Sequence, residues 1–181
     1  MSTTPIAVPT LWGVTYRAVV VHTLTYLLVG ALAFALFDYP ALFAEPGLRE
    51  LFRQTDDPMV MAGPLFQPLR GALFGLVFYL LRESFFTHER GWVTMWIMLV
   101  VVGILSTFGP ALGSIEGLIY TRVPARFQLG WGMLEVLSQS LLLSVGVWYW
   151  VRHAEQRRLT VALSVLFVIG LLLPTLGLLL S

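Results

Sequence analysis

Three charged side chains of this sequence stand in strongly apolar surroundings, where a charge is costly unless it finds a partner. They are Arg70, Glu116 and Glu135. Two amide side chains accompany them, Gln67 three residues before Arg70 and Gln139 four residues after Glu135. The planar guanidinium of arginine matches a carboxylate through its fork of N–H donors. We therefore expect these five residues to form one polar site that binds a ligand or an ion inside the membrane.

The charges of this expected site leave several roles open. Two carboxylates and one guanidinium carry one excess negative charge, so one carboxylate would have a raised pKa and take up a proton. That property suits a proton-coupled site or a site for a cationic or polar ligand. In the structural alternative, the Arg–Glu pairs hold helices together, or Arg70 reaches the lipid headgroups. Catalysis is a third alternative role for these charged residues.

Other chemistry finds little support in the residue types. There is no Cys, and no His and carboxylate spacing typical of zinc occurs, so we expect no metal and no cofactor. His22 is the one histidine inside an apolar run, and we interpret it as a hydrogen-bonded packing residue rather than a haem or metal ligand. Ser114 lies near Glu116, but a nucleophile and base without an orienting third group form a weak motif.

The composition determines the class of protein. Hydrophobic residues make up 57% of the chain and charged residues 12%, and the mean hydropathy is +0.82. Soluble domains carry about 25% charged residues. The apolar runs are continuous and Leu-rich, which favours membrane-spanning helices over a β-barrel. The fold class is therefore all-α, an integral membrane helical bundle. A net charge of +1 argues against nucleic acid as a partner.

The apolar runs predict a single transmembrane domain over residues 1–181 with five spans, at about 11–37, 64–82, 92–109, 129–151 and 159–180. The last span is nearly featureless and reads as a peripheral, lipid-facing helix. In the first connection, residues 46–54 place Pro46 at the start of a short amphipathic helix that would lie at the membrane surface. Gly71 and Gly75 form a small-xxx-small pair suited to close helix packing.

The third apolar run is too long for one crossing. From Val93 to Tyr120 a single helix would be about 42 Å long, whereas the hydrocarbon layer is about 30 Å thick. Gly109-Pro110 is the natural break in this run. We therefore expect the third span to end there, and residues 111–120 to form a half-helix or a re-entrant segment.

The order of the spans predicts the level of these charged residues in the bundle and the orientation of the chain in the membrane. Five spans place Arg70, Glu116 and Glu135 together in the half of the bundle far from the N-terminus. Basic residues concentrate in the turn 152–158 on the N-terminal side, so the positive-inside rule predicts a cytoplasmic N-terminus. The expected location is the inner (plasma) membrane, crossed several times.

The leading functional hypothesis is a small transport or binding protein, or a subunit of a membrane complex. The chain is small for a transporter made of two repeated halves, so we expect a homo-oligomer or a heteromeric complex, with membrane lipids as further partners. Two alternatives stay open. One is a membrane-embedded enzyme acting on a lipid or isoprenoid, with Glu116 or Glu135 as general acid or base. The other is a purely structural subunit.

Overall fold

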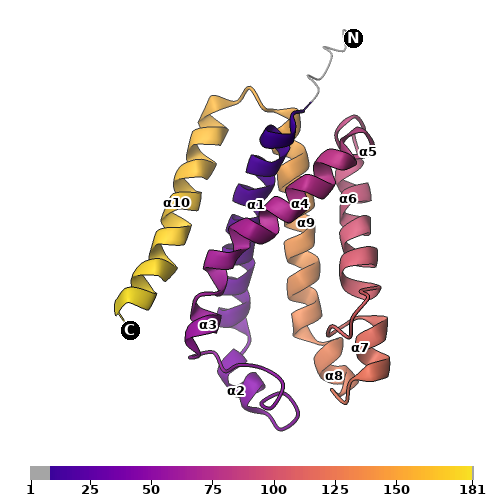
Figure 1. Cartoon of the computed structure of the whole chain (residues 1–181), viewed down its shortest axis with the longest axis vertical. Helices are drawn as coiled ribbons and strands as arrows, with labels where there is room; N and C mark the ends of the chain where they lie inside the picture. The colour runs from indigo at the N-terminus through magenta and orange to yellow at the C-terminus, as the bar shows by residue number, and fades with distance from the viewer. Residues whose placement is uncertain (1–8, 181) are drawn as a thin grey trace.

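The computed structural model describes residues 9–180, and within them the chain is 75% helical and contains no strand. The expected all-helical fold is confirmed. The expectations about the extreme N-terminus concern residues 1–8, which lie outside the described part. The elements in chain order are α1 (Leu11–Leu36), α2 (Tyr39–Ala44), α3 (Pro58–Met61), the 3-10 helix η1 (Gly63–Phe66), α4 (Gln67–Leu80), α5 (Arg82–Phe86), α6 (Gly91–Val100), the π-helix η2 (Val101–Leu105), α7 (Ile115–Tyr120), α8 (Ala125–Gln128), α9 (Trp131–Arg152) and α10 (Arg157–Leu180) (Figure 1).

Among residues 9–180, three helical segments, not five, are long and apolar enough to cross a membrane by length and composition. They are Leu11–Leu36, Ala125–Arg152 and Arg157–Leu179. The predicted second span, 64–82, begins in η1 and continues as α4, and the short helix α3 precedes it. Pro64 and Pro68 each remove a backbone donor and restrict the preceding residue, so this segment does not form one regular helix. The predicted third span ends at Leu105, where the chain has widened into η2.

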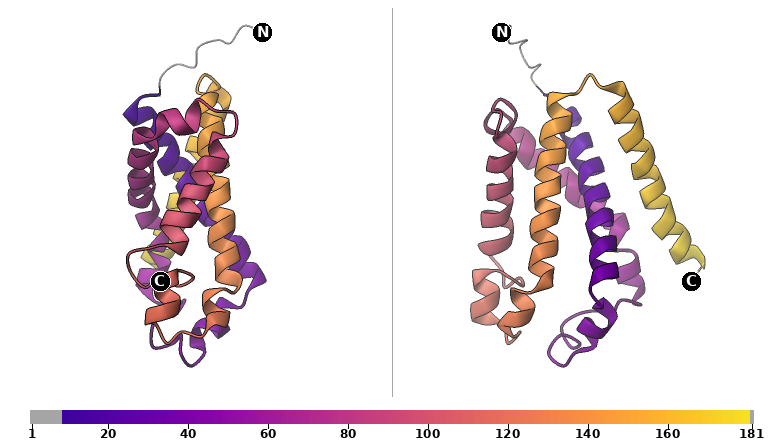
Figure 2. Two further views of the ribbon diagram at one scale, coloured as in Figure 1. Left: turned by 90° about the vertical axis from the view of Figure 1, so that its right-hand side faces the viewer. Right: turned by 180° about the vertical axis from the view of Figure 1, so that it is seen from behind.

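The helices pack around α1, which contacts α4, α9 and α10, while α6 packs on α9. α1 begins at one end of the molecule and α10 finishes at the other, with the intervening helices running back and forth between these ends (Figures 1 and 2). No residue of the α10 membrane-length window is buried. The expectation of a peripheral last helix is therefore confirmed.

Small residues allow α4 to lie directly against α1. A Cβ atom added at Gly71 would stand 2.7 Å from the Cα of Val19, and one added at Gly75 would stand 2.5 Å from the Cα of Thr15. Both contacts are with backbone, so no side-chain rotation could relieve them. The predicted role of the Gly71 and Gly75 pair in close helix packing is confirmed.

The buried core lies in the half of the bundle nearest the start of α1. Aromatic and aliphatic side chains from α1, α4, α5, α6 and α9 fill it, among them Val14, Phe78, Phe85, Met95 and Trp150. This packing fixes the crossing of α4 over α1 and of α6 over α9. It leaves the opposite half of the bundle less densely filled.

The predicted amphipathic helix over 46–54 is wrong. These residues form successive turns, and the short helices of this connection are α2, which precedes them, and α3, which follows them. Gly47 has a φ of 95°, which a right-handed helix does not accommodate. α2 begins after Asp38, whose side chain accepts from the Ala41 N–H at 3.1 Å. Leu48 is nevertheless buried, so the turns still anchor the loop.

The expected half-helix over 111–120 is shorter than predicted. It comprises α7 alone, which starts after Ser114, whose hydroxyl accepts from the Gly117 N–H at 2.9 Å. The preceding residues 106–114 form an irregular connector that turns at Gly113, with a φ of 80°. The break expected near Gly109-Pro110 is thus present, and the connector returns toward the bundle.

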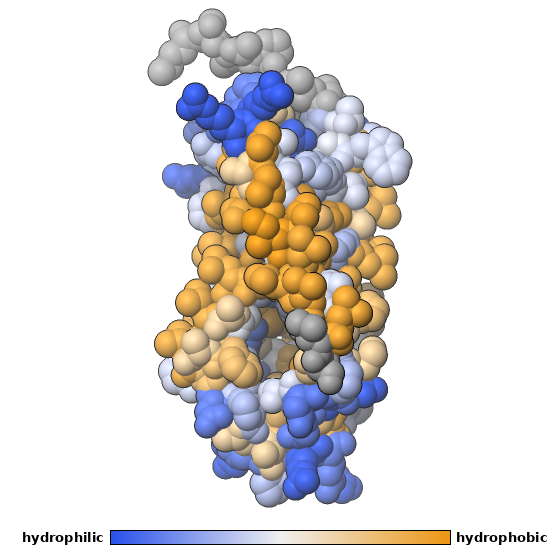
Figure 3. All heavy atoms as spheres, turned by 90° about the vertical axis from the view of Figure 1, so that its left-hand side faces the viewer, coloured by the Kyte–Doolittle hydropathy of each residue, from blue (hydrophilic) through white to orange (hydrophobic). Residues whose placement is uncertain are grey.

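Apolar side chains form a band across the middle of the molecule on the face that Figure 3 shows. Figure 3 shows hydrophobic side chains over the central part of one face, with hydrophilic side chains gathered at both ends. Large apolar side chains of α4, η2 and α10 are exposed in the structure, including Leu73, Val102 and Leu173. This distribution is typical of a protein surrounded by lipid.

Candidate functional site

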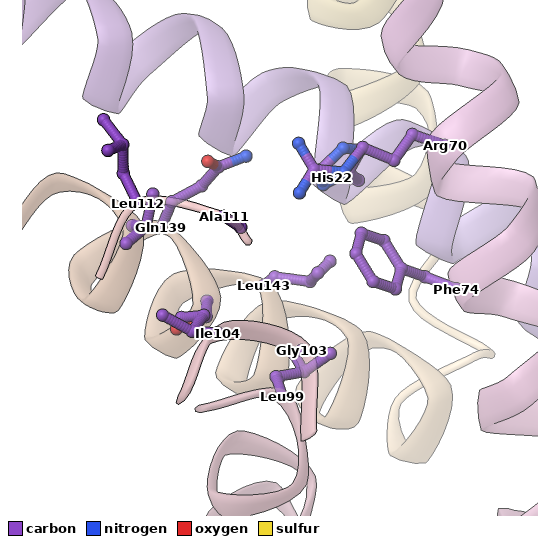
Figure 4. Close-up of a pocket in the computed structure, with 12 residues that line it drawn as sticks. His22, Arg70, Phe74, Leu99, Gly103, Ile104, Ala111, Leu112, Gln139 and Leu143 are labelled. Atoms are coloured by element: carbon purple, nitrogen blue, oxygen red, sulfur yellow. The ribbon is translucent and has the colours of Figure 1, made fainter. Parts of the chain in front are cut away.

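A cavity of about 330 Å³ lies between α1, α4, α6, η2, α9 and the connector. Its size falls at the small end of ligand pockets, which range over about 300–1,000 Å³. Polar groups line one side and apolar side chains the other (Figure 4). The lining residues are His22, Arg70, Phe74, Leu99, Gly103, Ile104, Ala111, Leu112, Val136, Gln139, Ser140 and Leu143.

His22 forms the deepest polar wall of this cavity. Its side chain is 2% exposed, and its Nε2 lies 3.1 Å from Oε1 of Gln67. The Gln67 amide nitrogen donates to the Gly63 carbonyl at 3.0 Å, so its oxygen faces the imidazole. Because that oxygen can only accept, Nε2 carries the proton, and Nδ1 is the acceptor of the neutral ring. Nδ1 is buried and has no hydrogen-bond partner.

Arg70 supplies the positive charge of the cavity. Its guanidinium carbon lies 5.6 Å from the centre of the Phe74 ring, a cation–π contact within the same helix. Figure 4 shows its side chain reaching across His22 toward the amide of Gln139. Within residues 9–180 the ion pairs are Arg53–Asp57 and Arg126–Glu45, so Arg70 has no carboxylate partner there.

The apolar wall owes its shape to η2 and the connector. In η2 the Ser106 N–H reaches back to the Val101 carbonyl at 2.9 Å, five residues earlier, which widens the helix. Gly103 lies in this turn, and a Cβ atom added there would meet no atom within 4 Å. Ala111 and Leu112 of the connector close the far side. Because the walls here are apolar and partly empty, they suit a hydrocarbon group.

The structure brings together three of the five residues expected at the site. Arg70 and Gln139 line the cavity, and Gln67 stands behind His22 as its hydrogen-bond partner. Glu135 lies on the next turn of α9, outside the cavity, and accepts a hydrogen bond from the Tyr39 hydroxyl. Glu116 lies on α7, and no hydrogen bond or ion pair joins it to any of the other four.

The expected Arg–Glu pairing is therefore absent from the described residues. Arg70 lines the cavity together with Gln139, and Glu135 stands one turn of α9 before Gln139. The two groups thus share a region of the molecule, as the predicted connectivity requires, but each has a different neighbour. A role for any of the five residues in binding stays a prediction.

The Tyr39–Glu135 contact connects α2 to α9 beside the cavity. Burial, reinforced by the hydrogen bond to Glu135, raises the pKa of the Tyr39 hydroxyl above its usual range. Tyr39 is also stacked on Phe43, at 5.4 Å between ring centres, and Phe37 is stacked on Trp131 at 5.0 Å. These aromatic contacts hold the first connection against the start of α9.

Sequence reasoning missed His22 as a lining residue, although its hydrogen bonding was expected. One signal in the sequence could have revealed it. If α1 and α4 are antiparallel neighbours, His22 and Gln67 lie at the same level of the bundle and can meet. It also missed the π-helix, because no residue pattern in Val101–Leu105 distinguishes a π-turn from an α-turn.

No group of three or more His, Cys, Asp or Glu side chains that could hold a metal gathers within residues 9–180. The chemistry that the cavity offers is instead polar recognition by Arg70, His22 and Gln139 beside an apolar wall. No family model, curated protein or solved structure matches this chain.

Proposed function

We propose that this chain is a polytopic membrane protein that binds a small ligand in the cavity of Arg70 and His22. Its role would be that of a transport or binding protein, or of a ligand-binding subunit in a membrane complex. One observation carries this proposal: a guanidinium without a carboxylate partner and a buried imidazole with an unpaired Nδ1 line the same cavity. An unpaired buried imidazole nitrogen is costly, and a ligand that meets Nδ1 would also reach the guanidinium of Arg70, which is exposed at the rim of the cavity.

The proposal includes five crossings of the membrane. The α3–η1–α4 segment, residues 58–80, is long enough to cross, since helix rises by about 1.5 Å per residue and 3-10 helix by about 2.0 Å. The α6–η2 segment reaches about 22 Å, and the connector with α7 would occupy the remaining depth. The run of these segments between the two ends of the molecule supports this arrangement (Figure 1).

We further propose an inner (plasma) membrane location with the N-terminal end in the cytoplasm. The end of the molecule where α1 begins also holds Arg82, Arg152, Arg157 and Arg158, and basic residues favour the cytoplasmic side. A homo-oligomer or a heteromeric complex would cover part of the exposed α10. Lipid would cover the remaining apolar band.

The two alternative roles gain less support from the geometry. A lipid- or isoprenoid-directed enzyme using Glu116 or Glu135 requires a carboxylate at the ligand, and neither residue lines the cavity. A purely structural subunit leaves the unpaired Nδ1 of His22 without explanation. The binding role accounts for both observations.

The test is to purify the protein from membranes and identify co-purifying small molecules by mass spectrometry. We expect a molecule that accompanies the unchanged protein and Gly177→Leu, a matched control at a glycine of α10 with open space around it. Arg70→Gln and Gly103→Leu should lose that molecule, the first by removing the charge and the second by filling the cavity. Equal recovery from all four proteins, or no specific molecule at all, would contradict the proposal.

A further inference from the structure

The cavity combines a polar end and an apolar end within one small volume. Arg70, His22 and Gln139 lie at the polar end, and Leu99, Gly103 and Ile104 lie across from them (Figure 4). A ligand that fills it must therefore carry a hydrogen-bonding head and a hydrocarbon part. A ligand that is polar throughout would leave the apolar wall against polar atoms, which costs free energy.

The donors and acceptors at the polar end restrict the head group further. The Arg70 guanidinium only donates and carries a positive charge, so it requires an anionic or strongly accepting group. The neutral imidazole of His22 presents an acceptor at Nδ1, because its Nε2 proton is directed to Gln67. A carboxylic acid satisfies both, since its carbonyl oxygen accepts from Arg70 and its O–H donates a hydrogen bond to Nδ1 of the neutral imidazole.

The rim of the cavity is exposed at the surface of the molecule, and exposed apolar residues stand beside it in the sequence. His22 forms its buried floor, whereas Arg70 and Gly103 at its rim are exposed. α4 packs on α1 and α6 packs on α9, and α4 and α6 diverge from α5, which joins them (Figure 1). Exposed apolar side chains of α4 and η2 stand within two residues of the lining residues, namely Leu69, Leu73, Val101, Val102 and Leu105.

We infer that the ligand is a single-chain aliphatic carboxylic acid, and that it enters the cavity sideways from the bilayer between α4 and η2. The neutral acid crosses the apolar opening without the cost of a charge in hydrocarbon. Its carboxyl group then hydrogen-bonds to Arg70 and His22, with its chain against η2 and the connector. This inference rests on the proposed function, since it assigns a ligand class and a route to the same cavity.

The absence of cysteine from the chain allows a direct test. A Gly103→Cys variant places a single thiol in the cavity wall, at a helical glycine with open space around it. The variant is reconstituted in phosphatidylcholine nanodiscs, which expose both membrane faces to water. Its labelling by N-ethylmaleimide, which partitions into lipid, is compared with labelling by a charged sulfonatoethyl methanethiosulfonate. The charged reagent is an anion that Arg70 attracts, so slow labelling would not reflect repulsion.

Two matched variants calibrate the rates. Glu50→Cys reports full access from water, because Glu50 is exposed in the first connection, and Gly177→Cys reports a lipid-facing site away from the cavity. We expect the charged reagent to label Gly103→Cys less than about one-tenth as fast as Glu50→Cys, since charged groups enter hydrocarbon poorly. N-ethylmaleimide should label Gly103→Cys and Gly177→Cys at similar rates.

The ligand class is tested by protection of Gly103→Cys from N-ethylmaleimide. Dodecanoate should slow the labelling at least about tenfold more than dodecanol or dodecyltrimethylammonium does, since hydrogen bonds to charged groups are the strong class. Adding Arg70→Gln should remove the difference between dodecanoate and dodecanol. Gly177→Cys should show no protection. Size-exclusion profiles and circular dichroism confirm that each variant is folded.

Several results would overturn the inference. Equal protection by dodecanol and dodecanoate would reject the acidic head group. Labelling of Gly103→Cys by the charged reagent at the rate of Glu50→Cys would show access from water and reject entry from the bilayer. If no amphiphile protects while a small molecule still co-purifies in an Arg70-dependent manner, this inference fails and the proposed function stands. If nothing co-purifies either, both fail.

Discussion

The imidazole Nε2 of His22 and the amide oxygen of Gln67 lie 3.1 Å apart and join α1 to α4 at the base of the cavity. The Gln67 amide is itself held by the Gly63 carbonyl, just before α4 begins. The glutamine thus determines which imidazole nitrogen carries the proton, and the other nitrogen is left for a ligand. Gln67 is a positioning residue in this arrangement, because it contacts His22 rather than the cavity.

Gln67→Leu should destabilise the protein and weaken binding together. It leaves the buried His22 Nε2 without a partner, a loss of about 1–3 kcal/mol, and frees the imidazole to rotate. We expect a lower melting temperature in detergent and less protection of Gly103→Cys by dodecanoate. Gln156→Leu, at an exposed glutamine in the turn before α10, is the matched control and should change neither quantity. An unchanged dodecanoate effect in a folded Gln67→Leu protein would reject the positioning role.

The two glutamates expected at the site should respond differently to neutralisation. Glu135→Gln replaces a charged acceptor of the Tyr39 hydroxyl with a neutral one, which should cost about 1 kcal/mol of stability. Glu116 has no hydrogen bond or ion pair with the site residues, so Glu116→Gln should stay within about 0.5 kcal/mol of the unchanged protein. Thermal unfolding in one detergent measures both. A dodecanoate response that is lost in Glu116→Gln would restore this residue to the site.

Alkaline pH should weaken the attachment of α2 to α9. Burial and the Glu135 hydrogen bond raise the pKa of Tyr39 above its ordinary value of 10.0. When the pKa of a group is higher in the folded protein than in the unfolded chain, its contribution to stability is complete below the unfolded-state pKa. That contribution is lost as the pH rises through the folded-state pKa. We expect the free energy of unfolding to fall above about pH 10, by up to about 1.4 kcal/mol per pH unit. The chain has no Lys to titrate in that range.

The comparison of Tyr39→Phe with Tyr120→Phe isolates this effect. Tyr120 is 71% exposed, so its substitution should leave the alkaline slope unchanged. Tyr39→Phe should flatten the slope and also lower stability at neutral pH, because Glu135 loses its donor. Equal slopes in the two variants would show that Tyr39 does not govern the alkaline transition.

The sequence predicts the elements that depend on long apolar runs. The runs near Leu11–Leu36, Trp131–Arg152 and Arg157–Leu180 became helices close to the expected bounds, since their composition leaves the backbone no other way to satisfy its hydrogen bonds in an apolar environment. Shorter elements were less predictable. The helix expected over 46–54 depends on Gly47 adopting a helical φ, whereas its actual turn is set by how the loop packs around Leu48.

The sequence predicted the level of the candidate site residues in the bundle, but not which residues they contact. Arg70, Gln67 and Gln139 were placed at one level by connectivity, and the structure places them around one cavity or directly behind it. Glu135 and Gln139 lie one turn apart on the same face of α9, so which neighbour each takes depends on what stands at its level. Gln139 meets the cavity, whereas Glu135, nearer the start of the helix, meets Tyr39 of the first connection. The spacing of residues in the sequence does not say how far the first connection folds over α9.

The packing of α4 on α1 should control both stability and the site. In Gly75→Ala the added Cβ would stand 2.5 Å from the Cα of Thr15, so the two backbones must separate. Overpacking of this kind costs about 1–3 kcal/mol. Because Arg70 lies on the same helix, displacement of α4 should also move its guanidinium and reduce dodecanoate protection of Gly103→Cys.

Gly30→Ala on α1 is the control. It has open space around the new methyl group, and it should stabilise the helix by about 0.5–1 kcal/mol instead. Opposite signs for the two glycine substitutions in thermal unfolding would support the close α1–α4 contact, and equal signs would reject it.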